Sequence, residues 1–345
     1  MNKTSAFDLL NKKTYKLDLK NKKLISELLK NSRESFTQIA KKIGVSKESV
    51  QYRYHQLIEK QIVISTYARI NYRALGYEKF HVLLLINEKN PKQQDDFIKA
   101  LCKDSNVLRV IEFNDDWDLE VVILAKDIRD FDNILKRILD PYASLIRKKD
   151  TEAVIDVVDK NAIPDIGKIS TVRSRDVTNV KIDEQDLLIL HSLGKDARVS
   201  TYKISPIVKL SADAIGLRIK KLEKAGVIDG YTCSLNFSNL DYLGFLFSFT
   251  LGSFPKDEET RYLTYMSKNP YVLSIKKMLG TWDFKNYFIV KNMGDFHKLI
   301  KDLKKEFSGF VQDYQTLVIY KEHMFNPCPD IVIGKVSSIK GLKKK

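Results

Sequence analysis

The sequence has few of the residues that build disulfide frameworks or zinc sites. Its 345 residues include three cysteines, Cys102, Cys233 and Cys328, which lie far apart without CxxC spacing. This pattern argues against disulfides and zinc, and it favours a reducing compartment. We also find no Gly-rich phosphate loop and no nucleophile–base constellation. The residues therefore give no indication of an enzyme, and we expect no catalytic residue, metal or cofactor.

Long apolar segments are missing as well. Aliphatic runs such as residues 82–86 are far too short to span a bilayer. The first residues contain no apolar core of signal-peptide length. We therefore expect a cytoplasmic protein without a membrane partner.

Acidic residues are in the minority. The chain has 44 Asp and Glu against 59 Lys and Arg, which gives a formal net charge of +15. A basic balance of this kind is typical of proteins that meet a polyanion such as DNA, although a lysine-rich surface would give the same count. The length suggests roughly two or three domains.

Residues 46–60 read as a helix with a distinct start. Ser46 can cap the helix, and Gly44 before it permits a sharp turn. Residues 36–43 form a second, shorter apolar-periodic segment. A short helix, a Gly-containing turn and a capped helix together predict a helix-turn-helix, although small helical bundles contain similar turns.

The polar face of the longer helix carries side chains that can reach base edges and phosphates. Arg53 has an alternative, because it could pair with an acidic neighbour instead of phosphate. The candidate DNA-binding residues of this unit are Ser46, Lys47, Glu48, Ser49, Gln51, Tyr52, Arg53 and Gln56.

Around this helix pair the chain continues in a regular order. Asp18 caps a preceding helix, and the β-branched run 62–70 suits a short strand, so the unit reads as a winged helix-turn-helix. A βαββαβ unit of ferredoxin-like type follows. Its expected strands and helices are residues 80–86, 91–103, 107–113, 119–125, 128–139 and 153–158.

The whole pattern then repeats at an offset of 165 positions. Asp18 recurs as Asp183, and the two tryptophans of the chain, Trp117 and Trp282, coincide. One register over so long a span identifies a tandem duplication. The fold class is therefore α+β, with two winged helix-turn-helix units alternating with two ferredoxin-like βαββαβ units. We expect a flexible N-terminus (1–15), first helix-turn-helix (16–72), first βαββαβ unit (73–159), linker (160–180), second helix-turn-helix (181–238), second βαββαβ unit (239–321) and mobile tail (322–345).

These features resemble the Lrp/AsnC family, the leucine-responsive and feast/famine regulators. The resemblance covers nearly the whole chain outside its termini and linker. In the first copy it rests on Leu17, Asp18, Asn31, Arg33, Ile39, Ala40, Ile43, Gly44, Ser46, Val50, Arg53, Leu57, Ile58 and Glu59. In the second copy it rests on Ile182, Asp183, Asp196, Arg198, Leu210, Ser211, Ile215, Arg218, Leu222, Glu223 and residues 226–231.

The resemblance implies that the βαββαβ units sense ligands and dimerise, with amino acids as the usual effectors. The implied effector-binding residues are Trp117, Asp118, Gly280, Trp282 and Asp283, although the tryptophans could equally be core aromatics. Asp115 replaces Gly280 in the first copy, which weakens the effector site there. Because one chain holds both copies, we expect an intramolecular pseudo-dimer, with a larger homo-oligomer left open.

The two DNA-reading units are not equivalent. Residues 16–66 hold eleven basic and five acidic side chains, whereas residues 181–231 hold nine and seven. In the second unit Gly216 and Leu217 replace Gln51 and Tyr52, and Pro206 is tolerable only if its helix begins late. The second unit's candidate DNA-binding residues are Ser211, Arg218, Lys220 and Lys221. We expect the first unit to read the DNA sequence and the second unit mainly to hold the register by binding the phosphate backbone.

The leading hypothesis is a sequence-specific, double-stranded-DNA-binding transcriptional regulator of Lrp/AsnC type. One alternative is an enzyme like the sirohaem decarboxylases, which reuse this arrangement and would need cationic and His groups around a tetrapyrrole. The five histidines are scattered and do not match between the copies. The other alternative is an architectural DNA-binding protein with little sequence preference.

Overall fold

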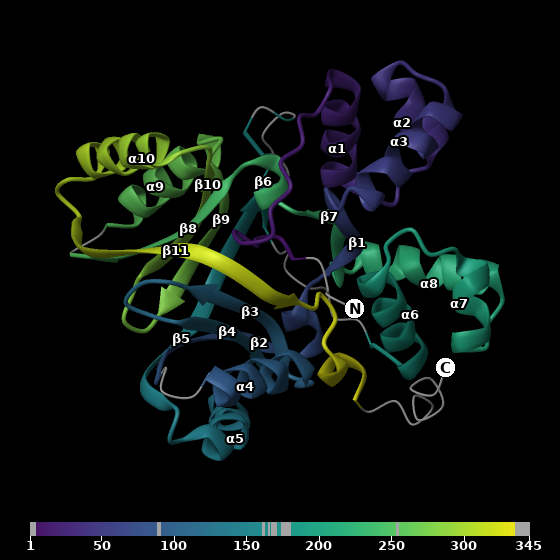
Figure 1. Cartoon of the computed structure of the whole chain (residues 1–345). Helices are drawn as coiled ribbons and strands as arrows, with labels where there is room; N and C mark the ends of the chain where they lie inside the picture. Colours follow the sequence, from purple (N-terminus) through teal and green to yellow (C-terminus); the bar gives the residue numbers. More distant parts are fainter. Residues whose placement is uncertain are drawn as a thin grey trace.

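Two helical heads lie on one side of the molecule and a large sheet with outer helices lies on the other (Figure 1). The computed structural model describes residues 5–87, 91–160, 163–164, 166, 171–173, 181–252 and 255–334. Within them the chain passes through a head and a βαββαβ half, then through a second head and a second half. This is the architecture that the duplication predicts.

Each head is a three-helix unit. The first consists of α1 (Leu19–Asn31), α2 (Phe36–Ile43) and α3 (Lys47–Glu59). The second consists of α6 (Glu184–Lys195), α7 (Thr201–Val208) and α8 (Ala212–Lys224). Local chemistry explains these bounds. Asp18 and Ser46 cap α1 and α3 as predicted, and Gly44 ends α2 with a left-handed φ of 70°.

The strand after each head does not form a hairpin within its own unit. Strand β1 (Val63–Ile70) pairs antiparallel with β7 (Ile228–Leu235) from the other copy, with Thr66 opposite Cys233. The winged units that we expected therefore share one two-stranded ribbon. The ribbon ties the two heads together through backbone hydrogen bonds.

The two βαββαβ halves join into one closed sheet. The first half is β2 (Glu78–Ile86), α4 (Pro91–Lys103), β3 (Val107–Phe113), β4 (Leu119–Ala125), α5 (Ile128–Leu139) and β5 (Ile146–Lys160). The second half is β8 (Leu243–Leu251), α9 (Lys256–Lys268), β9 (Val272–Leu279), β10 (Phe284–Val290), α10 (Met293–Glu306) and β11 (Val311–Phe325). Strand order β2-β4-β3-β11-β8-β10-β9-β5 returns to β2 through the β2–β5 pairing.

Edge pairing between strands of the two copies closes the sheet of the pseudo-dimer. Strand β3 pairs with β11 and β5 pairs with β9, so each half completes the other's edges. Helices α4 and α5 cover the outer face of one half, and α9 and α10 cover that of the other (Figure 1). An edge that is paired within the chain is unavailable for aggregation.

Two expectations about the chain ends are wrong for the residues that the structure describes, and the described part of the linker contains a short strand. In the N-terminus, Phe7 is 1% exposed and packs against Gly244, where an added Cβ would lie 2.5 Å from the Phe7 ring. In the tail, β11 runs to Phe325, and Asp330–Ile333 forms a 3-10 helix whose Val332 and Ile333 are buried with the second head. In the linker, β6 (Thr171–Arg173) pairs with β5.

Helix α7 also differs from the expectation. It begins at Thr201, so Pro206 lies well inside it rather than in a first turn. The helix is short and ends two residues later at Val208, where Lys209 takes a left-handed conformation. The proline therefore costs few helical hydrogen bonds.

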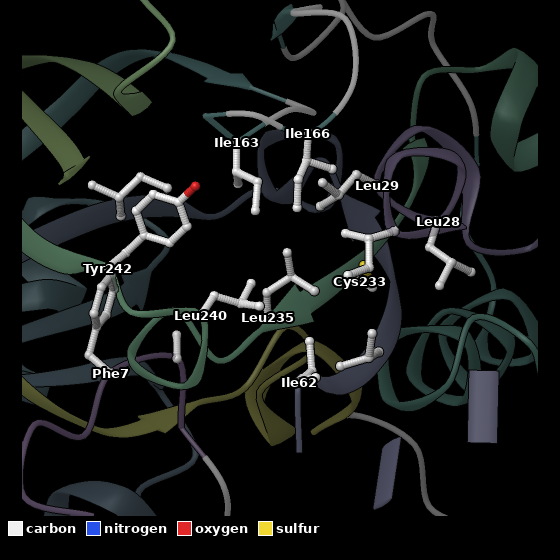
Figure 2. Close-up of a cluster of buried hydrophobic side chains, with 14 of the residues drawn as sticks. Phe7, Leu28, Leu29, Ile62, Ile163, Ile166, Cys233, Leu235, Leu240 and Tyr242 are labelled. Carbon is white, nitrogen blue, oxygen red and sulfur yellow. The ribbon is translucent and has the colours of Figure 1, made fainter. Parts of the chain in front are cut away.

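A mixed core fixes the first head to the sheet. Its side chains come from the N-terminus, α1, the ribbon and the linker, which are distant in sequence (Figure 2). Ile163 and Ile166 of the linker are both 4% exposed and pack here. The first head is therefore held to the sheet by side-chain packing as well as by the chain connection.

Candidate nucleic-acid interface

Helix α3 presents a polar surface to solvent. Ser46, Lys47, Glu48 and Tyr52 are exposed, and Tyr52 is 68% exposed. Ser49, Gln51, Arg53 and Gln56 are half-buried along the same helix. The Ser46 hydroxyl accepts the Ser49 backbone N–H at 3.1 Å, so its first role is to cap the helix.

The corresponding face of α8 is less polar. Leu217 stands at the position of Tyr52 and is also 68% exposed. Lys220 and Lys221 are exposed as predicted, and Ser211 caps the helix at the Ala214 amide. An exposed leucine can contact a thymine methyl but cannot hydrogen-bond a base edge. The two recognition helices therefore have the same geometry and different chemistry.

Arg53 and Arg218 are held within their own heads. Arg53 Nη1 donates to Asp18 Oδ2 at 2.7 Å and to Asn21 Oδ1 at 2.9 Å. Arg218 Nη1 donates to Asp183 Oδ2 at 2.7 Å and to Asp186 Oδ1 at 2.8 Å. For both arginines the structure thus shows pairing with an acidic neighbour, the alternative that we left open for Arg53. Each arginine joins its recognition helix to the start of the first helix of its head.

A pair of reciprocal arginines locks the two heads together. Arg33 Nη1 donates to the carbonyl oxygens of Ala197 (2.5 Å) and Val199 (3.0 Å) in the second head. Arg198 Nη1 donates to those of Ser32 (2.6 Å) and Glu34 (2.9 Å) in the first. Arg33 and Arg198 occupy the same repeat position, as do their acceptors, so the contact obeys the pseudo-two-fold symmetry.

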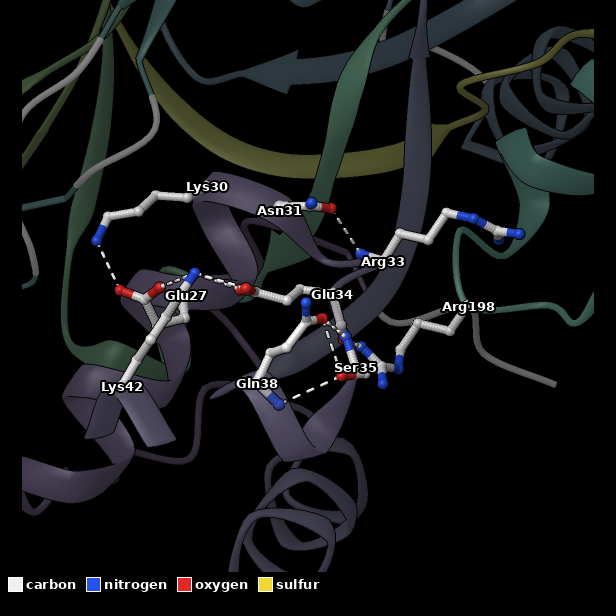
Figure 3. A network of polar contacts seen from close by, with 9 residues as sticks. All are labelled: Glu27, Lys30, Asn31, Arg33, Glu34, Ser35, Gln38, Lys42 and Arg198. Atoms are coloured by element: carbon white, nitrogen blue, oxygen red, sulfur yellow. Dashed lines mark hydrogen bonds and ion pairs between the residues drawn. The ribbon is translucent and has the colours of Figure 1, made fainter. Parts of the chain in front are cut away.

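A polar network surrounds this lock on the first head (Figure 3). Lys42 bridges Glu34 at 2.6 Å and Glu27 at 3.4 Å, and Glu27 also pairs with Lys30 at 2.6 Å. The Arg198 guanidinium lies 3.9 Å from the centroid of the Phe36 ring at the start of α2. The orientation of α2 is therefore coupled to the second head.

The tryptophan–aspartate turns of the βαββαβ halves have structural roles in both copies. Trp117 and Trp282 are 6% and 9% exposed. Asp118 Oδ2 accepts the Ile86 N–H at 2.6 Å, and Asp283 Oδ2 accepts the Leu251 N–H at 2.7 Å. The carboxylates thus fix the ends of β2 and β8 in both copies.

Gly280 has a steric role. Its φ is +156°, and an added Cβ would lie 2.7 Å from Glu152 Cγ on β5 of the first copy. The Trp282 N–H donates to Glu152 Oε1 at 3.2 Å across the same junction. Asp115 occupies this repeat position in the first copy, and like Gly280 it is exposed. The close approach of Glu152 therefore explains why the second copy has a glycine here.

A buried ionic network inside the closed sheet was not anticipated from the sequence. His81 Nδ1 lies 2.7 Å from Glu120 Oε1, and Lys285 Nζ lies 3.6 Å from the same oxygen. Lys276 Nζ lies 3.3 Å from His81 Nε2, and the Tyr287 hydroxyl donates to Glu120. Burial lowers the pKa of His81 to about 3, so the imidazole is neutral and donates from Nδ1 to the carboxylate.

The repeat alignment does contain a signal for this network. Glu120 and Lys285 occupy the same position of the two copies, and both side chains are fully buried. Opposite charges at one buried repeat position indicate that the two positions meet at the pseudo-two-fold axis. Strand β4 is otherwise apolar along its whole length. Hydrophobic periodicity therefore cannot show that the single charged residue in it is buried.

In the part of the chain that the structure describes, no group of three or more His, Cys, Asp or Glu side chains could hold a metal ion. None of the described helices is long and apolar enough to cross a membrane.

The paired heads and the closed sheet define a class: helix-turn-helix proteins in which two DNA-reading units are carried by joined ferredoxin-like halves. The family model for the AsnC-type helix-turn-helix domain matches residues 17–58 and 182–223, one match in each head. The leucine-responsive regulatory protein of Escherichia coli is 30% identical over 142 residues, which cover 41% of this chain and 86% of that protein. The chain belongs to the Lrp/AsnC family.

Two further proteins are similar to this chain. An uncharacterised helix-turn-helix transcriptional regulator of Pyrococcus abyssi is 30% identical over 121 residues, covering 35% of this chain and 80% of that protein. The crystal structure of the siroheme decarboxylase NirDL superposes with a TM-score of 0.63 at 13% identity, covering 94% of this chain and 99% of that one. The latter likeness shows that the whole two-copy arrangement is a known fold.

Proposed function

We propose that this protein is a DNA-binding transcriptional regulator of Lrp/AsnC type in which one chain supplies both DNA-reading heads. The observation that carries the proposal is the reciprocal lock of Arg33 and Arg198, which holds the two recognition helices in one fixed relation. A helix-turn-helix dimer binds two half-sites whose spacing mirrors the spacing of its recognition helices. The duplication achieves within one chain what such a dimer achieves with two.

The chemistry of the heads supports a division of labour. The first head has the more basic surface and the polar recognition face that includes Gln51 and Tyr52. The second head offers Lys220 and Lys221 for phosphates but Leu217 at the base-reading position. The first head thus supplies sequence readout, and the second holds the register on the phosphate backbone.

An amino-acid effector acting through the βαββαβ halves is part of the proposal. Its support is the family, since the relatives are regulators and include a leucine-responsive protein. The proposed residues remain those of the turns, Trp117, Asp118, Gly280, Trp282 and Asp283. Because these side chains already serve the fold, an effector would act by altering the turns rather than by occupying free groups.

The test is fluorescence anisotropy of labelled upstream DNA and of a scrambled duplex at several salt concentrations. A specific regulator keeps its preference for the upstream duplex at physiological salt. Equal binding of both duplexes with a steep salt slope would favour the architectural alternative. Absence of binding to either duplex would refute both DNA-based functions.

A second candidate is an enzyme of the sirohaem decarboxylase kind. The observation that favours it is the whole-chain fold likeness to NirDL. A cationic chamber between the β1–β7 ribbon and the closed sheet measures about 260 Å³, below the roughly 300–1,000 Å³ of sites for drug-sized ligands, which argues against a tetrapyrrole there. Absorption titration with iron-uroporphyrin tests this candidate, and saturable binding at one site per chain would favour it over the regulator.

A further inference from the structure

A chamber of about 260 Å³ lies between the β1–β7 ribbon and the closed sheet. Its walls come from both copies: the ribbon, the N-terminus, strands β2, β3, β4, β5, β9, β10 and β11, and the linker residues Ile163 and Val172. It is separate from the recognition helices and from the tryptophan–aspartate turns. Neither the DNA-binding nor the effector proposal makes use of it.

The chamber lies on the pseudo-two-fold axis of the molecule. Most of its lining residues occur as pairs related by the 165-position offset. These pairs are Phe7 and Val172, Tyr67 and Thr232, Ala68 and Cys233, Arg69 and Ser234, Ile70 and Leu235, Tyr72 and Phe237, Leu108 and Leu273, Arg109 and Ser274, Val122 and Tyr287, Val157 and Glu322, and Lys160 and Phe325. A cavity lined by both members of so many pairs must contain the axis that relates them.

The two sides of this axial chamber carry different charge. The first copy contributes the cations Arg69, Lys79, Arg109 and Lys160. The residues at the matching positions of the second copy are neutral: Ser234, Gly244, Ser274 and Phe325. The second copy adds one cation, Lys276, and the lining anions are Asp159, Asp229 and Glu322. Cations therefore outnumber anions by five to three, with four of the five on one side.

The pairing of these charges leaves some cations without a carboxylate. Arg109 Nε donates to Glu322 Oε2 at 2.6 Å, and Lys160 donates to the Asn269 carbonyl. Lys79 Nζ lies 5.1 Å from the Tyr72 ring centroid, and Lys276 Nζ lies 4.3 Å from that of Tyr287. Among the described residues, no carboxylate oxygen forms an ion pair with Lys79 or Lys276.

A polar group in the chamber wall is also unused. The Ser274 hydroxyl is buried and has no hydrogen-bond partner among the residues that the structure describes. A buried hydroxyl without a partner costs free energy, which a bound acceptor would recover. The wall therefore presents donors and positive charge toward one small space.

We propose that the axial chamber binds one small anion per chain, a ligand with a carboxylate or phosphate group, held by Lys79, Lys276 and Arg109 with a hydrogen bond from Ser274. The volume limits the ligand to a small metabolite. In a symmetric homodimer an axial ligand would have two equivalent orientations. The one-sided charge of this duplicated chain selects a single orientation, with the anionic group toward the first copy.

Protonation should be linked to this binding. Burial lowers the pKa of Lys276 to about 7 and that of Lys160 to about 8. A bound anion would stabilise the charged ammonium groups and raise both pKa values, so binding takes up protons and weakens as pH rises through about 7. The other titratable groups that face Lys276 are Lys79, His81, Arg109, Glu120, Asp159, Tyr287 and Glu322.

The test is isothermal titration calorimetry of the full chain with citrate and, separately, with inorganic phosphate. Both titrations are carried out at pH 6 and at pH 8 without DNA, with chloride added to keep the ionic strength constant. We expect one site per chain for at least one probe, with affinity at least tenfold higher at pH 6. Citrate binding alone identifies a carboxylate ligand, and phosphate binding alone identifies a phosphate ligand. No saturable heat from either probe would overturn the proposal.

Matched variants locate the site. Lys79→Met and Lys276→Met should each weaken binding at least tenfold. Lys277→Met should change it less than twofold, because Lys277 pairs with Glu259 at 2.6 Å outside the chamber. Equal effects of Lys276→Met and Lys277→Met would refute the assignment. If a variant fails to fold, the unmodified chain provides the test. Its proton uptake on ligand binding is measured in two buffers of different ionisation enthalpy, and the absence of uptake would refute the assigned site. The site does not require DNA binding, so the two proposals can fail independently.

Discussion

Arg33 of the first head and Arg198 of the second make equivalent hydrogen bonds to the opposite head. Each donates to two backbone carbonyls that flank the other arginine, at 2.5–3.0 Å for Arg33 and 2.6–2.9 Å for Arg198. Hydrogen bonds from a guanidinium to a carbonyl are charge-assisted and directional. The two heads therefore move as one body, which is the structural basis for the predictions about DNA binding.

Arg33→Ala and Arg198→Ala should destabilise the chain by similar amounts. Each removes charge-assisted hydrogen bonds worth about 1.5–3 kcal/mol in total. Each should also weaken DNA binding, because the two recognition helices lose their fixed spacing. Thermal unfolding and anisotropy measure the two effects. Arg129→Ala, on helix α5 far from the heads, is the control and should change neither; DNA affinity unaltered by both head variants would contradict the rigid pairing.

Tyr52→Ala should weaken DNA binding more than Leu217→Ala. The two side chains occupy one repeat position and are equally exposed, at 68%, so neither substitution removes core packing. The loss expected for a base or sugar contact by Tyr52 is about 1–3 kcal/mol. Anisotropy with the upstream duplex at physiological salt measures both. Equal losses would show that the heads read DNA equivalently.

Gly280→Ala and Gly216→Ala should have opposite effects on stability. At Gly280 the φ of +156° and the Glu152 side chain at 2.7 Å make an added Cβ unfavourable, by about 1–3 kcal/mol. At Gly216, inside helix α8, no atom lies within 4 Å of an added Cβ, and alanine should stabilise by about 1 kcal/mol. Denaturant unfolding measures both. Two changes of the same sign would contradict this account.

Acid should destabilise the protein through His81. Its pKa is about 3 in the folded chain against an ordinary value of 6.5. Between these values the unfolded chain binds the extra proton, so stability rises with pH across this window and is lost as pH falls through it. Burial raises the pKa of Glu120, but the interaction with His81 and the charge of Lys285 outweigh it and lower this pKa, which adds to the loss below its ordinary value of 4.5.

The variant that tests this is His81→Gln. It should flatten the dependence of the melting temperature on pH between about 4 and 6.5, because a neutral amide takes up no proton on unfolding. His55→Gln, at an exposed position of α3, is the matched substitution for comparison. An unaltered slope in His81→Gln would assign the acid sensitivity to other groups.

Local chemistry in the sequence determined much of the fold. Helix caps at Asp18 and Ser46, apolar periodicity and the 165-position repeat predicted the heads, the βαββαβ order and the pseudo-dimer. These features are set by neighbours in the chain or by the comparison of two copies. The expectation that Phe7 would lie in a flexible N-terminus was wrong, because Phe7 packs against Gly244, which is distant in sequence.

Only the tertiary structure decided how the two copies meet. In the structure β1 pairs with β7, and Arg53 and Arg218 form ion pairs with acidic neighbours. Arg33 and Arg198 each donate hydrogen bonds to the opposite head. It also gathered the cations of the axial chamber from strands that are far apart in the chain. The physical reason is that burial and pairing of charges depend on distances between strands, which periodicity and composition do not contain.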